Sequence, residues 1–306
     1  MPQAIRFASY GDADVLNLVD VPLPEPGADE VRVAVRAVGV NPIDWKIRSG
    51  AFSGGEELTE PAGTGIELAG LVDAVGPDVT DWQVGQAVFG RSANRSAAAT
   101  HDVAGVSELM AKPDELSFAQ AAALPVAVET AYRTLRDLGV STGDTLLIHA
   151  AAGGVGLVAV QLARAWGARV IGTAGASNHA FLEKIGAVPV SYGDGLVERV
   201  RAAAPQGIDA VLDASGRGVL PESIELAGGP DRVLTIADLA AADHGVRFSG
   251  TPVPMREALG AVLPMIEDGR IHMPIDSAFP LPRMADAHRH SEQGHLNGKI
   301  VVEVDG

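Results

Sequence analysis

An apolar stretch that runs directly into a glycine-rich turn is the feature that most constrains this fold. Residues 145–150 read Thr-Leu-Leu-Ile-His-Ala, and the turn at residues 151–156 contains three glycines. Over residues 155–166 apolar side chains recur every three or four positions, which is the spacing of one face of an amphipathic helix. A strand, a glycine turn and a helix in direct succession are typical of the first βαβ unit of a dinucleotide-binding domain.

The residues of this turn suit a pyrophosphate group. Glycine has no Cβ, so the backbone can approach the phosphates, and the start of the helix offers free N–H donors. Gly153 and Gly156 fill the second and third positions of the Gly-x-Gly-x-x-Gly pattern, whereas Ala151 stands at the first. A tight turn without a ligand is the simpler alternative, but the strand and helix in register favour cofactor binding. The residues expected to contact the cofactor here are Ala152, Gly153, Gly154, Val155 and Gly156.

Short apolar segments alternate with amphipathic helical segments from about residue 144 to about residue 233. Apolar strands are expected at residues 169–173 and 210–213, with a helix between them at residues 178–185. Such alternation predicts a parallel sheet connected by crossover helices.

The first third of the chain has the pattern of β structure. Residues 31–38 show a period of two that suits a half-buried strand, and the apolar runs at residues 71–75 and 84–89 are bounded by Gly, Pro or Asp. Ser117 then opens an Ala-rich segment as a plausible helix N-cap, and a second domain is expected to begin about there. Residues 298–304 are expected to form one more strand, which could pair in either domain.

The choice between NAD and NADP is normally made about 20 residues after the glycine turn, where a carboxylate binds the ribose 2′-hydroxyl of NAD. Here the strand at residues 168–175 is followed by hydroxyl, amide and imidazole groups, and no carboxylate occurs before Glu183. We therefore expect NADPH, with Thr173, Ser177 and Asn178 near its 2′-phosphate. No Arg or Lys lies in this turn, and Ser177 as the cap of the next helix is an alternative interpretation.

Composition excludes several classes of function. The net charge of −16 disfavours a phosphate-neutralising surface, because nucleic-acid affinity depends on clustered Lys and Arg. The chain has no cysteine, which excludes disulfides, thiolate catalysis and cysteine-containing metal sites. No apolar run approaches the roughly 20 residues that span a bilayer, and the N-terminal residues lack a signal-peptide pattern. We expect a cytoplasmic protein with no nucleic-acid partner and no membrane partner.

Four ordered motifs now point to a known family. They are Gly39-Val-Asn-Pro-Ile-Asp44, Gly65-Ile-Glu-Leu-Ala-Gly70, the segment from Leu124 to Tyr132, and the glycine turn itself. Together they resemble the zinc-free quinone oxidoreductase and ζ-crystallin branch of the medium-chain dehydrogenase/reductase superfamily, in which alanine is usual at the first glycine position.

The resemblance implies an α/β fold made of a GroES-like β domain and a Rossmann domain with a doubly wound parallel sheet. It places the GroES-like catalytic domain at residues 1–120 and 272–306, and the NADP-binding domain at residues 121–271. It also implies a homodimer.

The resemblance further implies that catalytic zinc is absent. The zinc-dependent alcohol dehydrogenases of the superfamily carry a Cys ligand in the first motif and Gly-His-Glu in the second. Here Val40-Asn41 and Gly65-Ile66-Glu67 occupy those places, so both the thiolate and the imidazole ligands are missing. Asp44 and Glu67 would offer only oxygen ligands, which make a poor zinc site. We expect Glu67 to be structural and no metal to be bound.

Without a Lewis acid, reduction of an already polarised acceptor is easier than oxidation of an alcohol. We therefore expect hydride transfer from NADPH to a quinone or to an α,β-unsaturated carbonyl compound. Lys46 and Phe52 stand where several quinone oxidoreductases have tyrosines, which moves the expected substrate toward activated alkenes. Lys46 could stabilise an enolate or deliver a proton, or it could simply pair with Asp44, while Phe52 is expected to form a hydrophobic wall. The residues that the resemblance places near the nicotinamide are Asn41, Asp44, Lys46, Phe52 and Thr130.

The resemblance also places Tyr192 near the 2′-phosphate and Ile236 and Ala237 beside the nicotinamide, although Tyr192 could equally be a packed surface aromatic. His288, His290 and His295 are expected to be solvated. A non-enzymatic NADPH sensor would keep the same glycine turn. An enoyl-thioester reductase of polyketide or fatty-acid assembly is a further alternative, and the lack of a tyrosine at position 52 counts mildly against it.

Overall fold

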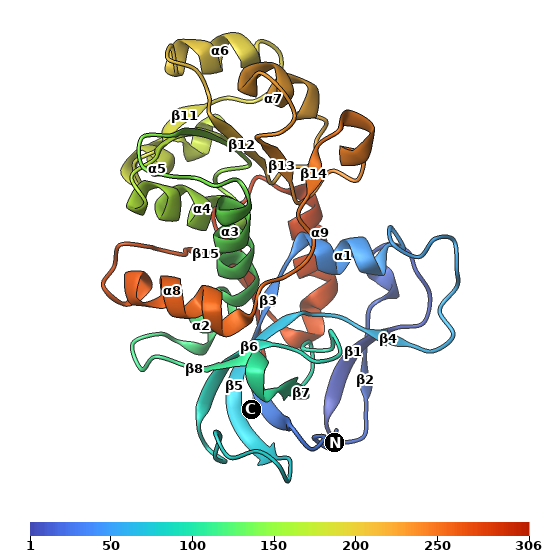
Figure 1. The fold of residues 1–306 in the computed structure, drawn as a ribbon. Coiled ribbons are helices and arrows are strands. Elements are labelled where there is room, and N and C mark those ends of the chain that lie inside the picture. The colour runs from blue at the N-terminus through green and yellow to red at the C-terminus, as the bar shows by residue number, and fades with distance from the viewer. Residues whose placement is uncertain (306) are drawn as a thin grey trace. The chain divides into compact units, whose positions relative to one another are not determined.

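The computed structural model describes residues 1–305, which form two compact units (Figure 1). Unit 1 consists of Met1–Val126, Pro254–Gly260 and the residues from Met273 onward. Unit 2 consists of Ala127–Val253 and Ala261–His272. The predicted α/β class is confirmed, because unit 1 contains mostly antiparallel β structure and unit 2 contains a parallel sheet with helices.

Unit 1 contains two sheets. The larger sheet has the strand order β15 (Ile275–Pro280), β16 (Lys299–Glu303), β3 (Glu30–Val40), β5 (Glu67–Val75), β6 (Ala87–Arg91) and β8 (Leu109–Ala111), with β7 (His101–Gly105) also paired to β3. The smaller sheet has the order β2 (Asn17–Asp20), β1 (Gln3–Phe7) and β4 (Ala62–Gly63). The helical segments are α1 (Pro42–Arg48), α2 (Phe118–Ala122), α9 (Met284–Gln293), η1 (Ala13–Val15), η2 (Val106–Glu108) and η5 (Leu281–Arg283).

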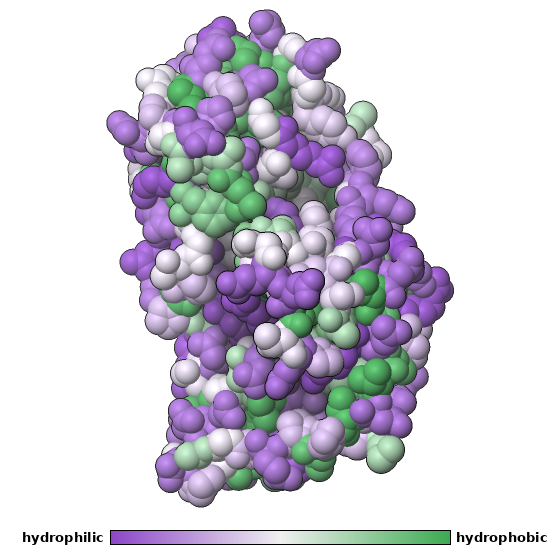
Figure 2. Space-filling view, turned by 90° about the vertical axis from the view of Figure 1, so that its right-hand side faces the viewer, coloured by the Kyte–Doolittle hydropathy of each residue, from purple (hydrophilic) through white to green (hydrophobic). Residues whose placement is uncertain are grey.

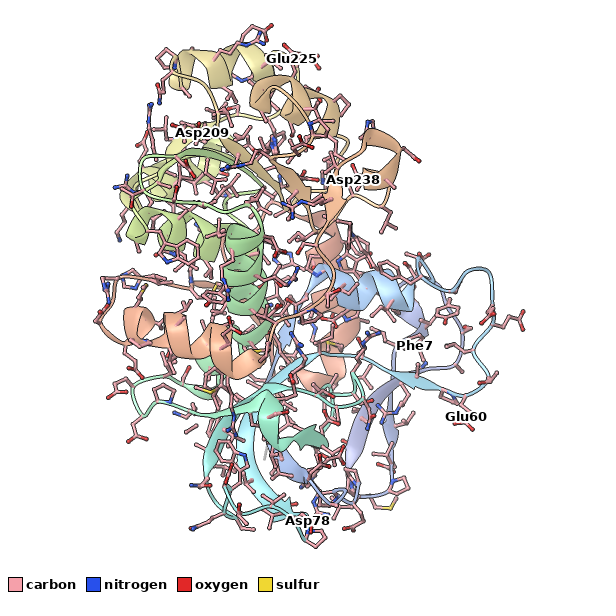
Figure 3. All side chains as sticks on the ribbon, viewed as in Figure 1. Phe7, Glu60, Asp78, Asp209, Glu225 and Asp238 are labelled. Atoms are coloured by element: carbon pink, nitrogen blue, oxygen red, sulfur yellow. The ribbon has the colours of Figure 1, made fainter. Side chains whose placement is uncertain are left out.

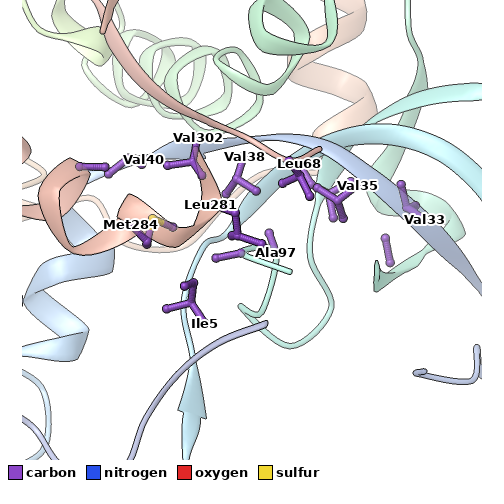
Figure 4. Packing of buried hydrophobic residues seen from close by; sticks show 14 of the residues in the cluster. Ile5, Val33, Val35, Val38, Val40, Leu68, Ala97, Leu281, Met284 and Val302 are labelled. Atoms are coloured by element: carbon purple, nitrogen blue, oxygen red, sulfur yellow. The ribbon is translucent and has the colours of Figure 1, made fainter. Parts of the chain in front are cut away.

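The core of unit 1 lies between its sheets and α9 (Figure 4). Ile5, Val38, Leu68, Met284 and Val302 come from five different elements and are each at most 2% exposed. Burial of one such side chain contributes about 1.5 to 3 kcal/mol, so these contacts define which elements belong together. The strand predicted at residues 31–38 and the strand predicted at the C-terminal end are both confirmed, and the latter pairs antiparallel with β3.

Unit 2 is built on a six-stranded parallel sheet, as the alternating pattern predicts. Its order is β11 (Val188–Val190), β10 (Arg169–Thr173), β9 (Thr145–His149), β12 (Ala210–Asp213), β13 (Val233–Thr235) and β14 (Arg247–Phe248). Its helical segments are α4 (Gly154–Ala165), α5 (His179–Lys184), α6 (Leu196–Ala203), α7 (Leu220–Ala227), η3 (Ala176–Asn178) and η4 (Ala241–His244). The chain continues from β9 to β10 on one side, and β12 lies on the other side. The switch point is therefore at the carboxyl end of β9, where ligands of such sheets bind.

Two helices cross the boundary between the units along the chain. The first is α3 (Pro125–Asp137), and the second is α8 (Met255–Glu267). The predicted helix start at Ser117 is confirmed, since Ser117 Oγ accepts from the Gln120 N–H at 3.1 Å and Gln120 Oε1 accepts from the Ser117 N–H at 2.9 Å. The helix is short, however, and ends after Ala122.

Acidic side chains account for the negative charge at the surface. Glu60 and Asp78 in unit 1 and Glu225 in unit 2 are exposed (Figure 3). On the face drawn in Figure 2, hydrophobic residues form separate patches among hydrophilic ones. Within residues 1–305, no helix combines the length and the apolar composition that a membrane crossing requires.

Candidate cofactor site and substrate-side residues

Gly153 is the N-cap of α4 at the switch point of the unit 2 sheet. Its φ of −77° is open to any residue, and a Cβ at this position would come no closer than 3.5 Å to the Ala150 carbonyl oxygen. The fold itself therefore does not require glycine here. A pyrophosphate that approaches the backbone would require it, because a side chain would fill the space that the phosphates need.

The first turn of α4 offers backbone donors. The first helical N–H with a carbonyl partner four residues back is that of Leu157, which donates to Gly153 at 2.8 Å. The N–H groups of residues 154–156 precede it, and the N-cap glycine has no side chain with which to bind them. These donors and the helix dipole suit an anion. Residues 152–156 are thus suited to a pyrophosphate, and their individual contacts stay predictions.

Ala151 occupies the first glycine position because the neighbouring strand makes room for it. Ala151 is fully buried, and a Cβ on Gly172 of β10 would lie 2.8 Å from the Ala151 methyl group. Gly172 on the adjacent strand thus leaves the space that the Ala151 methyl group fills. Gly156, in contrast, is required by the fold, since a Cβ there would lie 2.3 Å from the Ala150 carbonyl oxygen.

A network of uncharged side chains lies next to this turn, at the carboxyl ends of β9 and β10. The Ser223 hydroxyl donates to the Val219 carbonyl at 2.6 Å, so its oxygen accepts from His149 Nε2 at 3.1 Å. His149 Nδ1 then accepts from the Thr173 hydroxyl at 3.2 Å, and this pattern requires the neutral ring. Burial lowers the pKa of His149 to about 4, against the opposing effect of the Asp213 carboxylate. We call His149, Thr173 and Ser223 the histidine network.

The residues predicted near the 2′-phosphate lie at the end of β10 or after β10 and β11. Thr173 is buried, and its hydroxyl oxygen also accepts from the Ala150 N–H at 3.3 Å. Ser177 lies within η3, and the N-cap of α5 is Asn178, which makes no side-chain capping bond. Tyr192 is 50% exposed, and its hydroxyl and Ser177 Oγ lie 3.7 Å and 4.0 Å from the point where a Cβ on Gly175 would stand. Both hydroxyl groups therefore lie near Gly175.

The loop that carries Ile236 and Ala237 is anchored by Asp213, whose contacts the sequence did not reveal. Asp213 accepts from the Thr235 hydroxyl at 2.8 Å and from the Ser215 hydroxyl at 2.7 Å. Thr235 Oγ1 accepts in turn from the Ala237 N–H at 3.1 Å. Ile236 and Ala237 are half-buried. They follow β13, which pairs with β12, so they lie near the end of β12.

Unit 1 contains a buried ionic network around Lys299 of β16. The Lys299 ammonium group donates to Glu67 Oε1 at 2.5 Å, to Asn41 Oδ1 at 2.6 Å and to the Val40 carbonyl at 3.1 Å. Glu67 Oε1 also accepts from Asn41 Nδ2 at 2.8 Å, and Glu67 Oε2 accepts from the Val126 N–H at 2.7 Å. Lys299 is 4% exposed and Glu67 is fully buried, so the charges are satisfied by each other and by these groups. The structural role expected of Glu67 agrees with these contacts.

Asp44 joins this network at the start of α1. Its carboxylate accepts from the Asn41 N–H at 2.8 Å. Burial raises the pKa of Asp44 to about 7, and the neighbouring Glu67 carboxylate acts in the same direction, while Asn41 and Lys299 oppose the change. We call Lys299, Glu67, Asn41 and Asp44 the lysine network.

The other predicted catalytic residues have different surroundings. Lys46 is half-buried on α1, and its ammonium group lies 5.8 Å from the centroid of the Trp45 ring. Phe52 follows α1 and is 50% exposed. Thr130 belongs to α3 in unit 2, is 8% exposed and donates to the Glu129 carboxylate at 3.4 Å. Asn41 and Asp44 lie together in one network, and the roles of all five predicted residues stay predictions.

The prediction that His288 is solvated is wrong. Met284, Ala287, His288 and Ser291 form the buried face of α9, so the spacing of this helix turns the imidazole inward. Burial lowers the pKa of His288 to about 3, and the nearby Arg48 guanidinium acts in the same direction. His290 is half-buried and binds Asp276 at 2.9 Å, while His295 is exposed.

Two family profiles match this chain. Residues 27–127 match the alcohol dehydrogenase GroES-like domain, and residues 186–302 match the zinc-binding dehydrogenase domain. A quinone oxidoreductase of Lama guanicoe is 30% identical over 98% of this chain and 97% of its own length. The chain belongs to the quinone oxidoreductase branch of the medium-chain dehydrogenase/reductase superfamily. The family predicted from the four motifs is thereby confirmed, and family membership makes the chain an oxidoreductase.

Other relatives of this oxidoreductase have different names. The 2-methylene-furan-3-one reductase of Solanum lycopersicum is 32% identical over 98% of this chain and 78% of its own length. The pikromycin polyketide synthase component PikAII of Streptomyces venezuelae is 36% identical over 96% of this chain. The match spans only 8% of that very long protein.

Solved structures of this branch share the fold along the whole chain. The quinone oxidoreductase of Coxiella burnetii has a TM-score of 0.89 and 32% identity, and covers 99% of both chains. The Escherichia coli quinone oxidoreductase, solved in complex with NADPH, has a TM-score of 0.88 and 26% identity, and covers 98% of this chain and 99% of its own. Among residues 1–305 of the present oxidoreductase, no group of three or more His, Asp or Glu side chains is arranged to hold a metal ion.

Proposed function

We propose that this oxidoreductase uses NADPH to reduce α,β-unsaturated carbonyl compounds or quinones, with activated alkenes preferred. The observation that carries the proposal is the start of α4. Its first backbone N–H groups are not bound by a capping side chain, and the fold does not require glycine at the N-cap position 153, so both features suit a bound pyrophosphate. The names of the tomato enone reductase and of the quinone oxidoreductases support the substrate class. The NADPH complex of the Escherichia coli relative supports the cofactor.

NADPH, when bound, supplies the hydride that an electron-poor carbon accepts. In this proposal residues 152–156 of unit 2 bind the pyrophosphate, and Ile236 and Ala237 border the nicotinamide. Thr173, Ser177, Asn178 and Tyr192 surround the 2′-phosphate, with Thr173 acting through the backbone of the turn because its hydroxyl is buried.

Unit 1 residues are proposed to act on the substrate. Asn41 and Asp44 hold the start of α1 through the lysine network, and Lys46 follows on the same helix. Lys46 stabilises the enolate oxygen, because a cation lowers the energy of developing negative charge. Phe52 forms an apolar wall, and Thr130 of α3 is proposed to have a role in catalysis. The domain division into residues 1–120 with 272–306 and residues 121–271 is part of the same proposal.

Stopped-flow measurement of NADPH oxidation with a panel of enones, enals and quinones tests the proposal. We expect turnover with enones and enals to exceed that with quinones. The absence of turnover with every class, together with tight NADPH binding, would contradict the proposed reaction and favour an NADPH sensor.

A second candidate substrate class is an enoyl thioester. The 36% identity to a polyketide synthase component favours it, although the match is to a small part of that protein. The enoyl thioesters of N-acetylcysteamine should be added to the same panel. A thioester that is reduced faster than every enone would replace the first proposal by this one.

We further propose that the protein is a cytoplasmic homodimer. The β14 strand lies at the open edge of the unit 2 sheet, and its Phe248 is 45% exposed. An edge strand can pair with its own copy about a two-fold axis. Light scattering should report twice the chain mass, and Phe248→Asp should shift the protein toward the monomer. A monomeric parent protein contradicts the proposal.

A further inference from the structure

One guanidinium group in unit 2 binds four consecutive carbonyl groups. Arg199 lies on α6, and its nitrogens donate to the carbonyl oxygens of Ser191 at 3.0 Å, Tyr192 at 3.3 Å, Gly193 at 2.9 Å and Asp194 at 2.6 Å. Four of the five N–H groups of the guanidinium are engaged in this way. Hydrogen bonds from a charged donor are roughly twice as strong as neutral ones, so the arginine fixes the backbone of residues 191–194.

The backbone carbonyl groups of residues 191–194 depend on the Arg199 side chain for their hydrogen bonds. This loop joins β11 to α6, and its four carbonyl groups converge on one cation instead of on strand or helix donors. Gly193 and Gly195 have φ values of +88° and +75°, in the left-handed region that glycine adopts most readily. Without the guanidinium, the carbonyl dipoles would repel one another and the loop would sample other conformations.

The loop carries Tyr192 to the end of the neighbouring strand. The Tyr192 hydroxyl lies 3.7 Å, and Ser177 Oγ 4.0 Å, from the point where a Cβ on Gly175 would stand. Both side chains follow adjacent parallel strands, β10 and β11, at the sheet edge where the 2′-position of a dinucleotide is selected. The position of the Tyr192 ring therefore depends on the loop that Arg199 clamps.

We propose that Arg199 is a positioning residue for NADPH selection, which it achieves by holding Tyr192 beside Ser177 so that both hydroxyls can donate to the 2′-phosphate. The inference rests on the proposed NADPH dependence. Arg199 acts through the loop rather than by direct contact, because its N–H groups are largely occupied by the carbonyl groups.

The test compares the dissociation constants of NADPH and NADH in the full-length protein, measured by titration calorimetry. Arg199→Met should weaken NADPH binding about tenfold and leave NADH binding within about twofold, because only NADPH carries the 2′-phosphate. The matched control is Arg201→Met on the same helix. Arg201 forms a surface ion pair with Glu225 and is 58% exposed, so its loss should not change the ratio. An unchanged ratio in Arg199→Met, or an equal change in Arg201→Met, would overturn the inference.

Two further variants separate the clamp from simple charge. Arg199→Lys keeps the positive charge but cannot reach four carbonyl groups with a planar fork, so it should lose most of the preference. Full preference in Arg199→Lys would show that charge alone matters, and would overturn the clamp. Tyr192→Ala should lose the same preference, and Arg199→Met should add nothing further in that background. Additive losses would contradict action through Tyr192.

The outcomes also distinguish this inference from the proposed function. A parent protein that binds neither dinucleotide contradicts the proposed function itself. A parent protein that prefers NADPH, and keeps that preference in Arg199→Met, contradicts only the role of Arg199. If Arg199→Met fails to bind NADH and lacks a folded circular-dichroism spectrum, Arg199→Lys and Tyr192→Ala decide the question.

Discussion

The lysine network of unit 1 and the histidine network of unit 2 bury polar groups in opposite ways. In unit 1 the lysine network places an ammonium group and a carboxylate in the interior, and all three Lys299 donors have acceptors. In unit 2 the histidine network is held together by two hydroxyl groups, and its imidazole is neutral. The lysine network contains a buried ion pair, whereas the histidine network contains a neutral ring.

The difference follows from what each unit is proposed to bind. The backbone N–H groups at the start of α4 suit a phosphate group without the help of a cationic side chain, and a neutral His149 keeps the histidine network insensitive to pH near neutrality. In unit 1 the side chains of Asn41 and Asp44 cap the start of α1, and the charged groups of the lysine network hold Asn41 in place. Removing one member of the lysine network should therefore lower the free energy of unfolding more than removing one member of the histidine network.

The largest expected effect is the loss of the Lys299 ammonium group. Lys299→Met should lower the free energy of unfolding by about 3 to 5 kcal/mol, because Glu67 is left as an unpaired buried carboxylate. Adding Glu67→Gln should recover at least half of the loss. Urea denaturation measures both, with the exposed Lys184→Met as the control. A double variant as unstable as the single one would show that the charges are not the cause.

The histidine network should make the free energy of unfolding depend on pH. The pKa of His149 is lowered to about 4 from an ordinary 6.5, so its contribution is present above pH 6.5 and is lost as the pH falls through 4. Between pH 7 and pH 4.5 this loss amounts to about 2 to 3 kcal/mol. His149→Gln should lack it, whereas the exposed His244→Gln should behave as the parent protein does. Equal pH profiles for all three proteins would contradict a neutral buried His149.

The lysine network should respond to pH in the opposite direction. The pKa of Asp44 is raised to about 7, so its contribution is present at acidic pH and is lost as the pH rises from about 4 through 7. Relative to the parent protein, Asp44→Asn should gain about 2 kcal/mol in unfolding free energy between pH 5 and pH 8. Asp78→Asn, in an exposed loop, is the control and should show no such gain. A relative loss at pH 8 would reverse the assigned direction.

The smallest expected effect concerns packing in unit 2. Gly172→Ala would bring two methyl groups to 2.8 Å and should destabilise the protein by about 1 to 2 kcal/mol. Adding Ala151→Gly should restore the stability of Gly172→Ala, because the methyl group at position 172 then occupies the space that the Ala151 methyl group has left. Gly260→Ala in α8, where a Cβ meets nothing within 4 Å, should be stabilising. Thermal unfolding compares them, and a failure of rescue would exclude the Ala151 contact as the cause.

Local patterns were sufficient for much of the fold. Three features depend on residues that are close together in the chain. They are the strand at residues 31–38, the helix N-cap at Ser117, and the strand, turn and helix of residues 145–166. Propensity, capping and periodicity act over short distances along the chain, so the sequence alone predicts them. The motifs that indicate the family are local in the same sense.

The polar networks were not predictable in this way. Lys299 and Glu67 are 232 residues apart in the chain, and the contact exists because β16 pairs with β3, which in turn pairs with β5. The contacts of Arg199 were not predictable either, because it lies on α6, beyond the turn after β10, and the conformation of residues 191–194 brings their carbonyl groups to it. The burial of His288 was not predictable because the spacing of His288 and His290 does not indicate which face of α9 is buried.

The sequence by itself determined the strand, glycine turn and helix of the cofactor site, the absence of cysteine ligands and the family to which the chain belongs. Only the tertiary structure decided that glycine at position 172 compensates for alanine at position 151, that one arginine holds the Tyr192 loop, and that a buried lysine secures Asn41. The reason is physical. Hydrophobic periodicity is encoded in neighbouring residues, whereas the partner of a buried polar group is set by strand register and packing between distant segments.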